Sequence, residues 1–228
     1  LTGKKCTVVM PETSASVKIE AVRNYGATVE LIDTKIVGRN EKVSELAERM
    51  PDVYVASAYD DLFVIEGNST IGDELAQKNF DVIISPVGGG GLISGISKGL
   101  CRNSNQANLI GAEPLLGNDA AKSLKAGKII SNENEPQTIA DGARTLGLGK
   151  QNWEIIKSGV SEIIEVSEEK IKEAVRLYFA LANLKCEPTG ALSLGAILEN
   201  GEKFAGKKVC LVVSGGNVDT EKYLEILK

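Results

Sequence analysis

The sequence has 228 residues, of which 43% are hydrophobic and 25% are charged, and its formal net charge is −5. This composition is ordinary for a globular protein of one large domain or two modest ones, and the negative charge argues against a nucleic-acid-binding surface. Histidine is absent, which removes the commonest general base and the commonest zinc ligand. Any catalysis must therefore depend on lysine, serine, a carboxylate or a cofactor.

Strand-like and helix-like patterns alternate along the chain, which predicts βαβ units on a parallel sheet. In the first quarter, the patterns predict strands at 5–10, 27–32 and 53–56 and helices at 14–25 and 40–50. A helix at 62–78, a strand at 81–87, a helix at 91–101 and a strand at 108–113 follow. Residues 114–150 are rich in Gly, Asn and Pro and are predicted to contain only a short helix at 120–126. The remaining strands are expected at 162–166 and 207–213, and the remaining helices at 168–184, 189–200 and 219–228.

The predicted fold class is α/β, an open parallel twisted sheet flanked by helices. Residues 1–55 form a self-contained β-α-β-α-β succession, which we interpret as part of a small α/β domain, with a large domain over residues 56–228. The opening Leu-Thr-Gly-Lys-Lys resembles the end of a helix that runs into a strand. We therefore expect the chain to be a fragment that lacks its N-terminal part.

Neither a membrane segment nor an export signal is evident in the sequence. No apolar run reaches the roughly 18 residues that cross a bilayer, and the N-terminus lacks a charged, apolar and small-residue succession. We therefore expect a cytoplasmic protein with no membrane and no nucleic-acid partner. The four cysteines are widely spaced, without a Cys-x-x-Cys pair, which favours buried, reduced thiols.

Four consecutive glycines follow an apolar strand and precede an amphipathic helix; this tetraglycine turn consists of Gly88, Gly89, Gly90 and Gly91. Glycine permits positive φ and lets successive backbone N–H groups converge on an anion, aided by the positive end of the helix. A tight strand–helix connection is the alternative, but it needs fewer glycines. The turn therefore predicts a phosphate site. It matches neither the dinucleotide pattern G-x-G-x-x-G nor a Walker loop, because Ser94 replaces the last glycine and no Gly-Lys-Ser/Thr follows.

A second glycine turn, Ser-Gly-Gly-Asn over residues 214–217, follows the strand at 207–213. In open parallel sheets, ligands gather outside the carboxyl ends of the strands. Two glycine turns in this position are expected to form two walls of one pocket, with Ser214 presenting a hydroxyl. An ordinary left-handed turn remains the alternative.

Taken with Thr-Ile-Ala-Asp-Gly at 138–142 and Glu-Pro-Thr-Gly-Ala at 187–191, the two turns resemble the fold-type II, tryptophan synthase β-like pyridoxal-phosphate enzymes. Within these enzymes, the chain resembles the serine racemase and serine/threonine dehydratase (ammonia-lyase) group over essentially all of its length. The resemblance implies pyridoxal 5′-phosphate as cofactor, a small amino acid as substrate and a homodimer.

The resemblance also implies roles for individual residues. The tetraglycine turn and the Leu92 amide would hold the cofactor phosphate, and Ser214 would hydrogen-bond the pyridine nitrogen. Asn217 would support the Ser214 turn, Gly142 would border the substrate, and Glu187 would face the same pocket. A hydroxyl partner leaves the pyridine nitrogen largely unprotonated, which suits elimination and racemisation at the α-carbon.

A third constellation, Glu113, Gly117 and Asp119, follows a predicted strand. Two carboxylates and a carbonyl are hard oxygen ligands suited to Mg²⁺ or Ca²⁺, and the resemblance implies a divalent-cation site there. A solvated pair of surface carboxylates is the alternative.

The Schiff-base lysine of the family lies in a motif near the N-terminus, and no lysine of this chain occupies that position. We therefore assign no catalytic residue within the chain. The predicted function is a pyridoxal-phosphate-dependent ammonia-lyase that converts L-serine or L-threonine to a 2-oxo acid and ammonia, with serine racemase activity as an additional reaction. The alternatives are a β-replacement synthase of the cysteine synthase kind and a non-catalytic fragment of the fold. The preferred amino acid, the lyase-to-racemase balance and regulation by nucleotides stay open.

Overall fold

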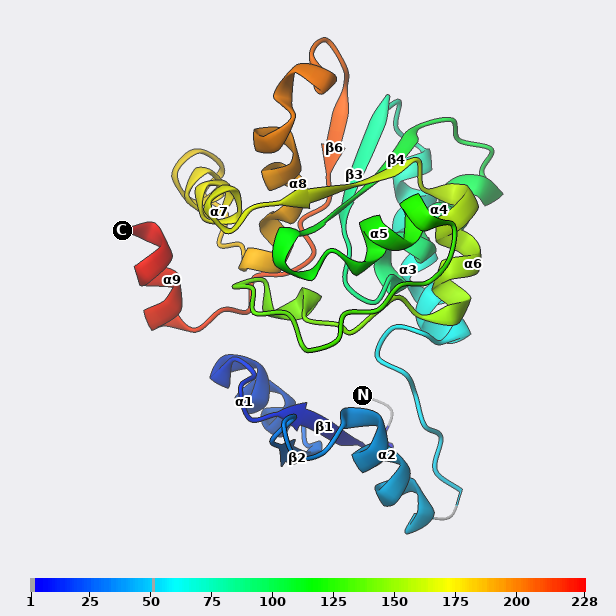
Figure 1. Ribbon diagram of the computed structural model, residues 1–228, viewed down its shortest axis with the longest axis vertical. Helices are drawn as coiled ribbons and strands as arrows, with labels where there is room; N and C mark the ends of the chain where they lie inside the picture. The colour runs from blue at the N-terminus through cyan, green and yellow to red at the C-terminus, as the bar shows by residue number, and fades with distance from the viewer. Residues whose placement is uncertain (1–2, 51) are drawn as a thin grey trace. The chain divides into compact units, whose positions relative to one another are not determined.

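The strands of the computed structural model form two separate parallel sheets within the described residues, 3–50 and 52–228. The chain divides into two compact units: one contains the residues up to Ala56 and Asn217–Leu224, and the other contains Ser57–Gly216 and Glu225–Lys228 (Figure 1). A two-stranded sheet belongs to the first unit and a four-stranded sheet to the second. The parallel α/β architecture that the sequence predicts is therefore confirmed.

The first unit pairs β1 (Thr7–Pro11) with β2 (Thr28–Ile32) and adds helices α1 (Ser16–Asn24) and α2 (Arg39–Glu48). Asp219 closes the N-terminus of α1, because its carboxylate accepts hydrogen bonds from the backbone N–H groups of Ser16 at 3.1 Å and Val17 at 2.9 Å. These contacts, the Val17 amide first, lower the pKa of Asp219 below its ordinary value. A residue from the far end of the chain thus stabilises the first helix of this unit.

The second unit is built on a sheet with the strand order β5-β4-β3-β6. Its strands are β3 (Val82–Pro86), β4 (Asn108–Pro114), β5 (Glu162–Val166) and β6 (Val209–Leu211). Its helices are α3 (Leu62–Ala76), α4 (Gly91–Arg102), α5 (Asp119–Ala126), α6 (Lys150–Gly159), α7 (Glu168–Ala182) and α8 (Pro188–Glu199). Helix α9 (Thr220–Leu227) crosses the boundary between the units.

Both faces of this sheet are covered, as a parallel sheet requires. Alternate residues of β3 enter different cores: Ile84 packs with side chains of α7 and α8, and Ile83 packs with side chains of α4 and α6. Helices α7 and α8 therefore lie on one face of the sheet, and α4 and α6 on the other, with α3 against α4 (Figure 1). Both isoleucines are fully buried.

Helices α3 and α4 approach each other closely because glycines line their contact. A Cβ atom at Gly72 would lie 2.4 Å from the Ile96 carbonyl oxygen, and one at Gly99 would lie 2.3 Å from the Ser69 carbonyl oxygen. On the exposed side of this contact, Lys98 and Arg102 of α4 form ion pairs with Glu66 of α3 at 2.6 Å and 2.8 Å. This contact fixes α4, whose first residue belongs to the tetraglycine turn.

Two sequence predictions of secondary structure are wrong. Residues 53–56 form no strand, and Val53, Tyr54 and Val55 are exposed by 44%, 65% and 49%. Helix α6 was not expected, since residues 114–150 and the segment after them lack a strong periodic pattern. The other predicted elements are present, with ends shifted by a few residues.

The cysteines differ from their prediction in one respect. Cys186 is buried and Cys210 partly so, but Cys6 and Cys101 are exposed, and all four are free thiols. None of the helices formed by residues 3–50 and 52–228 combines the length and apolarity that a membrane crossing needs.

Candidate functional site

The tetraglycine turn connects β3 to α4 in the second unit. Strands β3 and β6 are parallel neighbours, so the segments that follow them emerge from the same edge of the sheet. Gly90 has φ 97°, a left-handed conformation that favours glycine, and it is the N-cap of α4. The N–H groups of the first turn of α4 have no acceptor within the helix and point out of its N-terminal end.

Neighbouring segments leave no space for side chains on this turn. A Cβ atom at Gly88 would lie 2.9 Å from the Gly142 carbonyl oxygen. A Cβ atom at Gly89 would lie 2.2 Å from the ring of Tyr59, and one at Gly91 would lie 2.9 Å from the Tyr59 carbonyl oxygen. Glycine is therefore required at these positions by close packing, in addition to any ligand.

Helix α6 holds the middle of the turn. The Gly89 carbonyl oxygen accepts hydrogen bonds from the backbone N–H of Gly149 at 3.0 Å and from Nδ2 of Asn152 at 2.9 Å. The N-terminus of α6 is in turn closed by Asp60, whose carboxylate accepts from the N–H groups of Lys150 at 3.0 Å and Gln151 at 2.9 Å. The turn is thus fixed from a helix about sixty residues further along the chain.

The second glycine turn packs against the start of α8. The Gly215 carbonyl oxygen accepts from the backbone N–H of Glu187 at 3.1 Å, and a Cβ atom at Gly215 would lie 2.1 Å from Oε1 of Glu187. Ser193 of α8 donates its hydroxyl to the Val212 carbonyl oxygen at 2.9 Å, which holds the end of β6 just before the turn. Ser214 itself is exposed, so its hydroxyl is accessible to a ligand.

Gly142 connects the two turns. Its N–H donates to Oγ1 of Thr189 at 2.9 Å in the first turn of α8, while its carbonyl oxygen lies against Gly88. The structure therefore brings the tetraglycine turn, Gly142, Glu187 and the Gly215 segment together within the second unit. Leu92 is half-buried in the first turn of α4. Asn217 belongs to the first unit, and its predicted support of the Ser214 turn stays a prediction.

These residues fit a phosphate group bound through its anionic oxygens. The turn has no side chains, its residues Gly89–Gly91 are buried, and it opens a twelve-residue helix at the positive end of the helix dipole. Gly142 is exposed beside it. The arrangement can accept the phosphate of a cofactor whose ring extends toward Ser214.

Glu113 and Asp119 are each only 2% exposed, so the alternative of solvated surface carboxylates is wrong. The two oxygens of Glu113 accept from the N–H groups of Ala120 at 3.1 Å and Ala121 at 2.6 Å, at the start of α5. Oδ1 of Asp119 accepts from Nδ2 of Asn132 at 2.9 Å, and its buried Oδ2 has no hydrogen-bond partner among the described residues.

Burial dominates the acid–base properties of this pair. It raises the pKa of Glu113 to about 8, with the negative charge of Asp119 adding to the shift and the α5 amides opposing it. It raises the pKa of Asp119 to about 6. Gly117 is also buried, between the two carboxylates in sequence. Within residues 3–50 and 52–228, no group of three or more His, Cys, Asp or Glu side chains is arranged for a metal ion.

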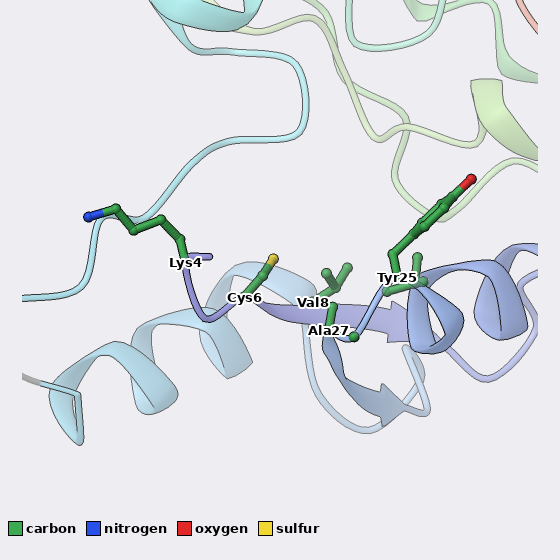
Figure 2. Close-up of a pocket in the computed structure, with 7 residues that line it drawn as sticks. Lys4, Cys6, Val8, Tyr25 and Ala27 are labelled. Carbon is green, nitrogen blue, oxygen red and sulfur yellow. The ribbon is translucent and has the colours of Figure 1, made fainter. Parts of the chain in front are cut away.

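Tyr59, Asp60, Asn152 and Thr189 contact the site but were not predicted from the sequence. Each acts through a partner distant in the chain, and no local pattern marks them. A separate pocket of about 260 Å³ lies in the first unit and is lined by residues that include Lys4, Cys6 and Tyr25 (Figure 2). None of the predicted site residues belongs to it.

Comparisons with known proteins agree with this geometry. Residues 1–215 match the family described as Pyridoxal-phosphate dependent enzyme. A β-hydroxyaspartate dehydratase of Paracoccus denitrificans (strain Pd 1222) is 37% identical over 224 residues, which are 97% of this chain and 70% of the relative. A serine racemase of Dictyostelium discoideum is 38% identical over 228 residues, 98% of this chain and 70% of the relative.

Solved structures have the same fold. A threonine deaminase of the organism abbreviated T.th. superposes with a TM-score of 0.86 at 38% identity, covering 95% of this chain and 71% of that structure. Maize serine racemase superposes with a TM-score of 0.89 at 30% identity, covering 98% of this chain and 69% of that structure.

Proposed function

The chain belongs to the family of pyridoxal-phosphate dependent enzymes, and on this premise we propose an ammonia-lyase that acts on L-serine or L-threonine, with serine racemase activity as an additional reaction. The observation that carries the proposal is the contact of the tetraglycine turn with Gly142, and of Gly142 with the start of α8. Relatives of this family named for lyase and racemase activities match nearly all of the chain.

Bound pyridoxal phosphate supplies an electron sink for the α-carbon of an amino acid. The tetraglycine turn and the Leu92 amide hold its phosphate through backbone N–H groups, and Ser214 donates to or accepts from the pyridine nitrogen. Because a serine hydroxyl is neutral, it leaves that nitrogen largely unprotonated, which moderates the electron sink. Glu187 and Gly142 border the substrate, and Asn217 supports the turn that carries Ser214.

A 3-hydroxyaspartate is the second candidate substrate. Two relatives named for that compound, a β-hydroxyaspartate dehydratase and an L-threo-3-hydroxyaspartate ammonia-lyase, are 37% and 35% identical to the chain. Like serine and threonine, this amino acid carries a hydroxyl on its β-carbon, so the same loss of hydroxyl and ammonia applies. No similar observation favours a β-replacement synthase.

The test uses the protein expressed from its complete reading frame, loaded with pyridoxal phosphate. We expect a visible absorption band from the lysine-bound cofactor and 2-oxo acid formation from L-serine, L-threonine or 3-hydroxyaspartate. Ser214→Ala is expected to retain the bound phosphate while lowering the rate. D-serine formation, measured on the same samples, reports the racemase reaction. A protein that binds the cofactor but consumes none of these amino acids would support the non-catalytic alternative.

We further propose that Glu113, Gly117 and Asp119 bind Mg²⁺ or Ca²⁺. The support is a buried carboxylate oxygen on Asp119 without a hydrogen-bond partner among the described residues, next to a second buried carboxylate. A bound cation stabilises the folded state by mass action, so MgCl₂ or CaCl₂ should raise the melting temperature of EDTA-treated protein. Asp119→Asn should abolish that increase. An equal increase in the variant would place the cation elsewhere.

The remaining proposals concern the whole protein: a cytoplasmic homodimer that binds a small amino acid and neither membrane nor nucleic acid. Light scattering after size-exclusion chromatography tests the dimer. For the domains, we propose a small domain that includes residues 1–55 and a large cofactor-binding domain over residues 56–228. Chymotrypsin should then cut first after exposed Tyr54.

A further inference from the structure

Asn152 is a fully buried amide that bridges two backbone segments of the site. Its Nδ2 donates to the carbonyl oxygens of Gly89 and Tyr59, both at 2.9 Å. We propose that Asn152 is a positioning residue for the phosphate: it turns the Gly89 carbonyl toward α6 and thereby directs the Gly90 N–H at the phosphate oxygens. This inference depends on the proposed function of the tetraglycine turn.

The peptide geometry supplies the first argument. The described peptide bonds are all trans, and in a trans peptide the carbonyl and the following N–H point in opposite directions. Since the Gly89 carbonyl is held by Asn152 and by the N–H of Gly149, the Gly90 N–H must point away from α6. Without those two donors, a peptide between two glycines is free to rotate, because glycine adopts most backbone conformations.

The packing of α6 supplies the second argument. A Cβ atom at Gly90 would lie 2.8 Å from Cδ1 of Ile156 and 3.0 Å from Cβ of Asn152, so α6 already touches the turn through apolar atoms. Leucine at position 152 would fill the same volume and make the same apolar contact. The polar amide is therefore unnecessary for packing alone.

The cost of the amide supplies the third argument. Oδ1 of Asn152 is buried and has no hydrogen-bond partner among the described residues, and leaving such an acceptor unsatisfied costs about 1–3 kcal/mol. Unsatisfied buried groups are rare and need a reason. The two carbonyl acceptors on the Nδ2 side give that reason, because only a donor can hold them.

The experiment compares pyridoxamine 5′-phosphate with pyridoxamine, since neither forms a Schiff base with lysine and they differ only in the phosphate. Isothermal titration calorimetry measures both affinities for the wild type, Asn152→Leu, Asn152→Asp and the control Gln151→Ala. Gln151 lies on the same turn of α6 and its side chain donates to the Tyr59-adjacent carbonyl of Asp60, at 3.1 Å, without touching the tetraglycine turn.

We expect the preference for the phosphorylated compound to fall roughly threefold to tenfold in Asn152→Leu, as the loss of one hydrogen bond predicts. It should fall further in Asn152→Asp, where an acceptor faces two carbonyl oxygens. Gln151→Ala should retain the wild-type preference. Urea unfolding of each variant separates lost affinity from lost stability, and Asn152→Asp provides the measurement if Asn152→Leu does not fold.

Two outcomes would overturn the inference, and they are distinguishable. A wild-type preference that both Asn152 variants retain would show that the turn binds phosphate without help from Asn152. No preference in the wild type would refute the phosphate role of the turn itself, and the role of Asn152 with it.

Discussion

The glycine contact between α3 and α4 gives a sharp prediction, because α3 contains two glycines in opposite surroundings. A Cβ atom at Gly72 would lie 2.4 Å from the Ile96 carbonyl oxygen and 2.8 Å from the Gly99 Cα, whereas one at Gly67 has nothing within 4 Å. Ordinary van der Waals contact begins at 3.4 Å. Gly72→Ala therefore forces the helices apart by about 1 Å, since backbone atoms cannot rotate away.

The magnitude follows from two opposing terms. Overpacking a rigid contact costs about 3 kcal/mol at its upper end, and alanine regains about 1 kcal/mol of helix propensity relative to glycine. Gly72→Ala should thus lower the free energy of unfolding by about 2 kcal/mol, whereas Gly67→Ala should raise it by about 0.5–1 kcal/mol. The two variants should differ by roughly 3 kcal/mol.

Urea unfolding followed by circular dichroism measures the difference, with the slope of each transition checked for a change in the unfolded state. Equal stabilities for Gly72→Ala and Gly67→Ala would refute the reasoning, because helix propensity alone treats the two sites alike.

Three further predictions concern single side chains. Glu66 has its pKa lowered to about 2 by hydrogen bonds from two cations of α4. Its contribution to stability is therefore present above pH 4.5 and lost as the pH falls toward 2, and Glu66→Gln should flatten that acid-induced loss in urea titrations. Asp60→Ala should lower the unfolding free energy by about 1 kcal/mol, since it removes the cap of α6. Iodoacetamide should label exposed Cys101 in the native protein, but Cys186, whose pKa burial raises to about 12, only after unfolding, as mass spectrometry would show.

The order of strands and helices was largely predictable because hydrophobic periodicity is a local signal. Helix α6 shows the limit: its cap is Asp60, about ninety residues earlier, so nothing at its own start announces a helix. Residues 53–56 show the opposite error. Their apolar alternation suits a strand, but a strand also needs a partner, and the described residues supply none.

The candidate site divides in the same way. Glycine turns at strand ends are visible in the sequence, because the chemistry of a phosphate loop requires consecutive residues without side chains. Asn152 and Thr189 are not, because they reach Gly89 and Gly142 only through the tertiary fold. Their residue types occur in many helices for other reasons.

Stability and phosphate recognition should be separable in this site. Gly72 lies at the contact that fixes the body of α4, whereas Asn152 acts on a single peptide at the start of that helix. A ligand that binds only the folded protein stabilises every variant in proportion to the logarithm of its occupancy. Gly72→Ala should therefore lower the unfolding free energy by a similar amount with and without pyridoxamine 5′-phosphate. Asn152→Leu should show its deficit mainly when the phosphorylated ligand is present, because its defect lies in the preference for phosphate.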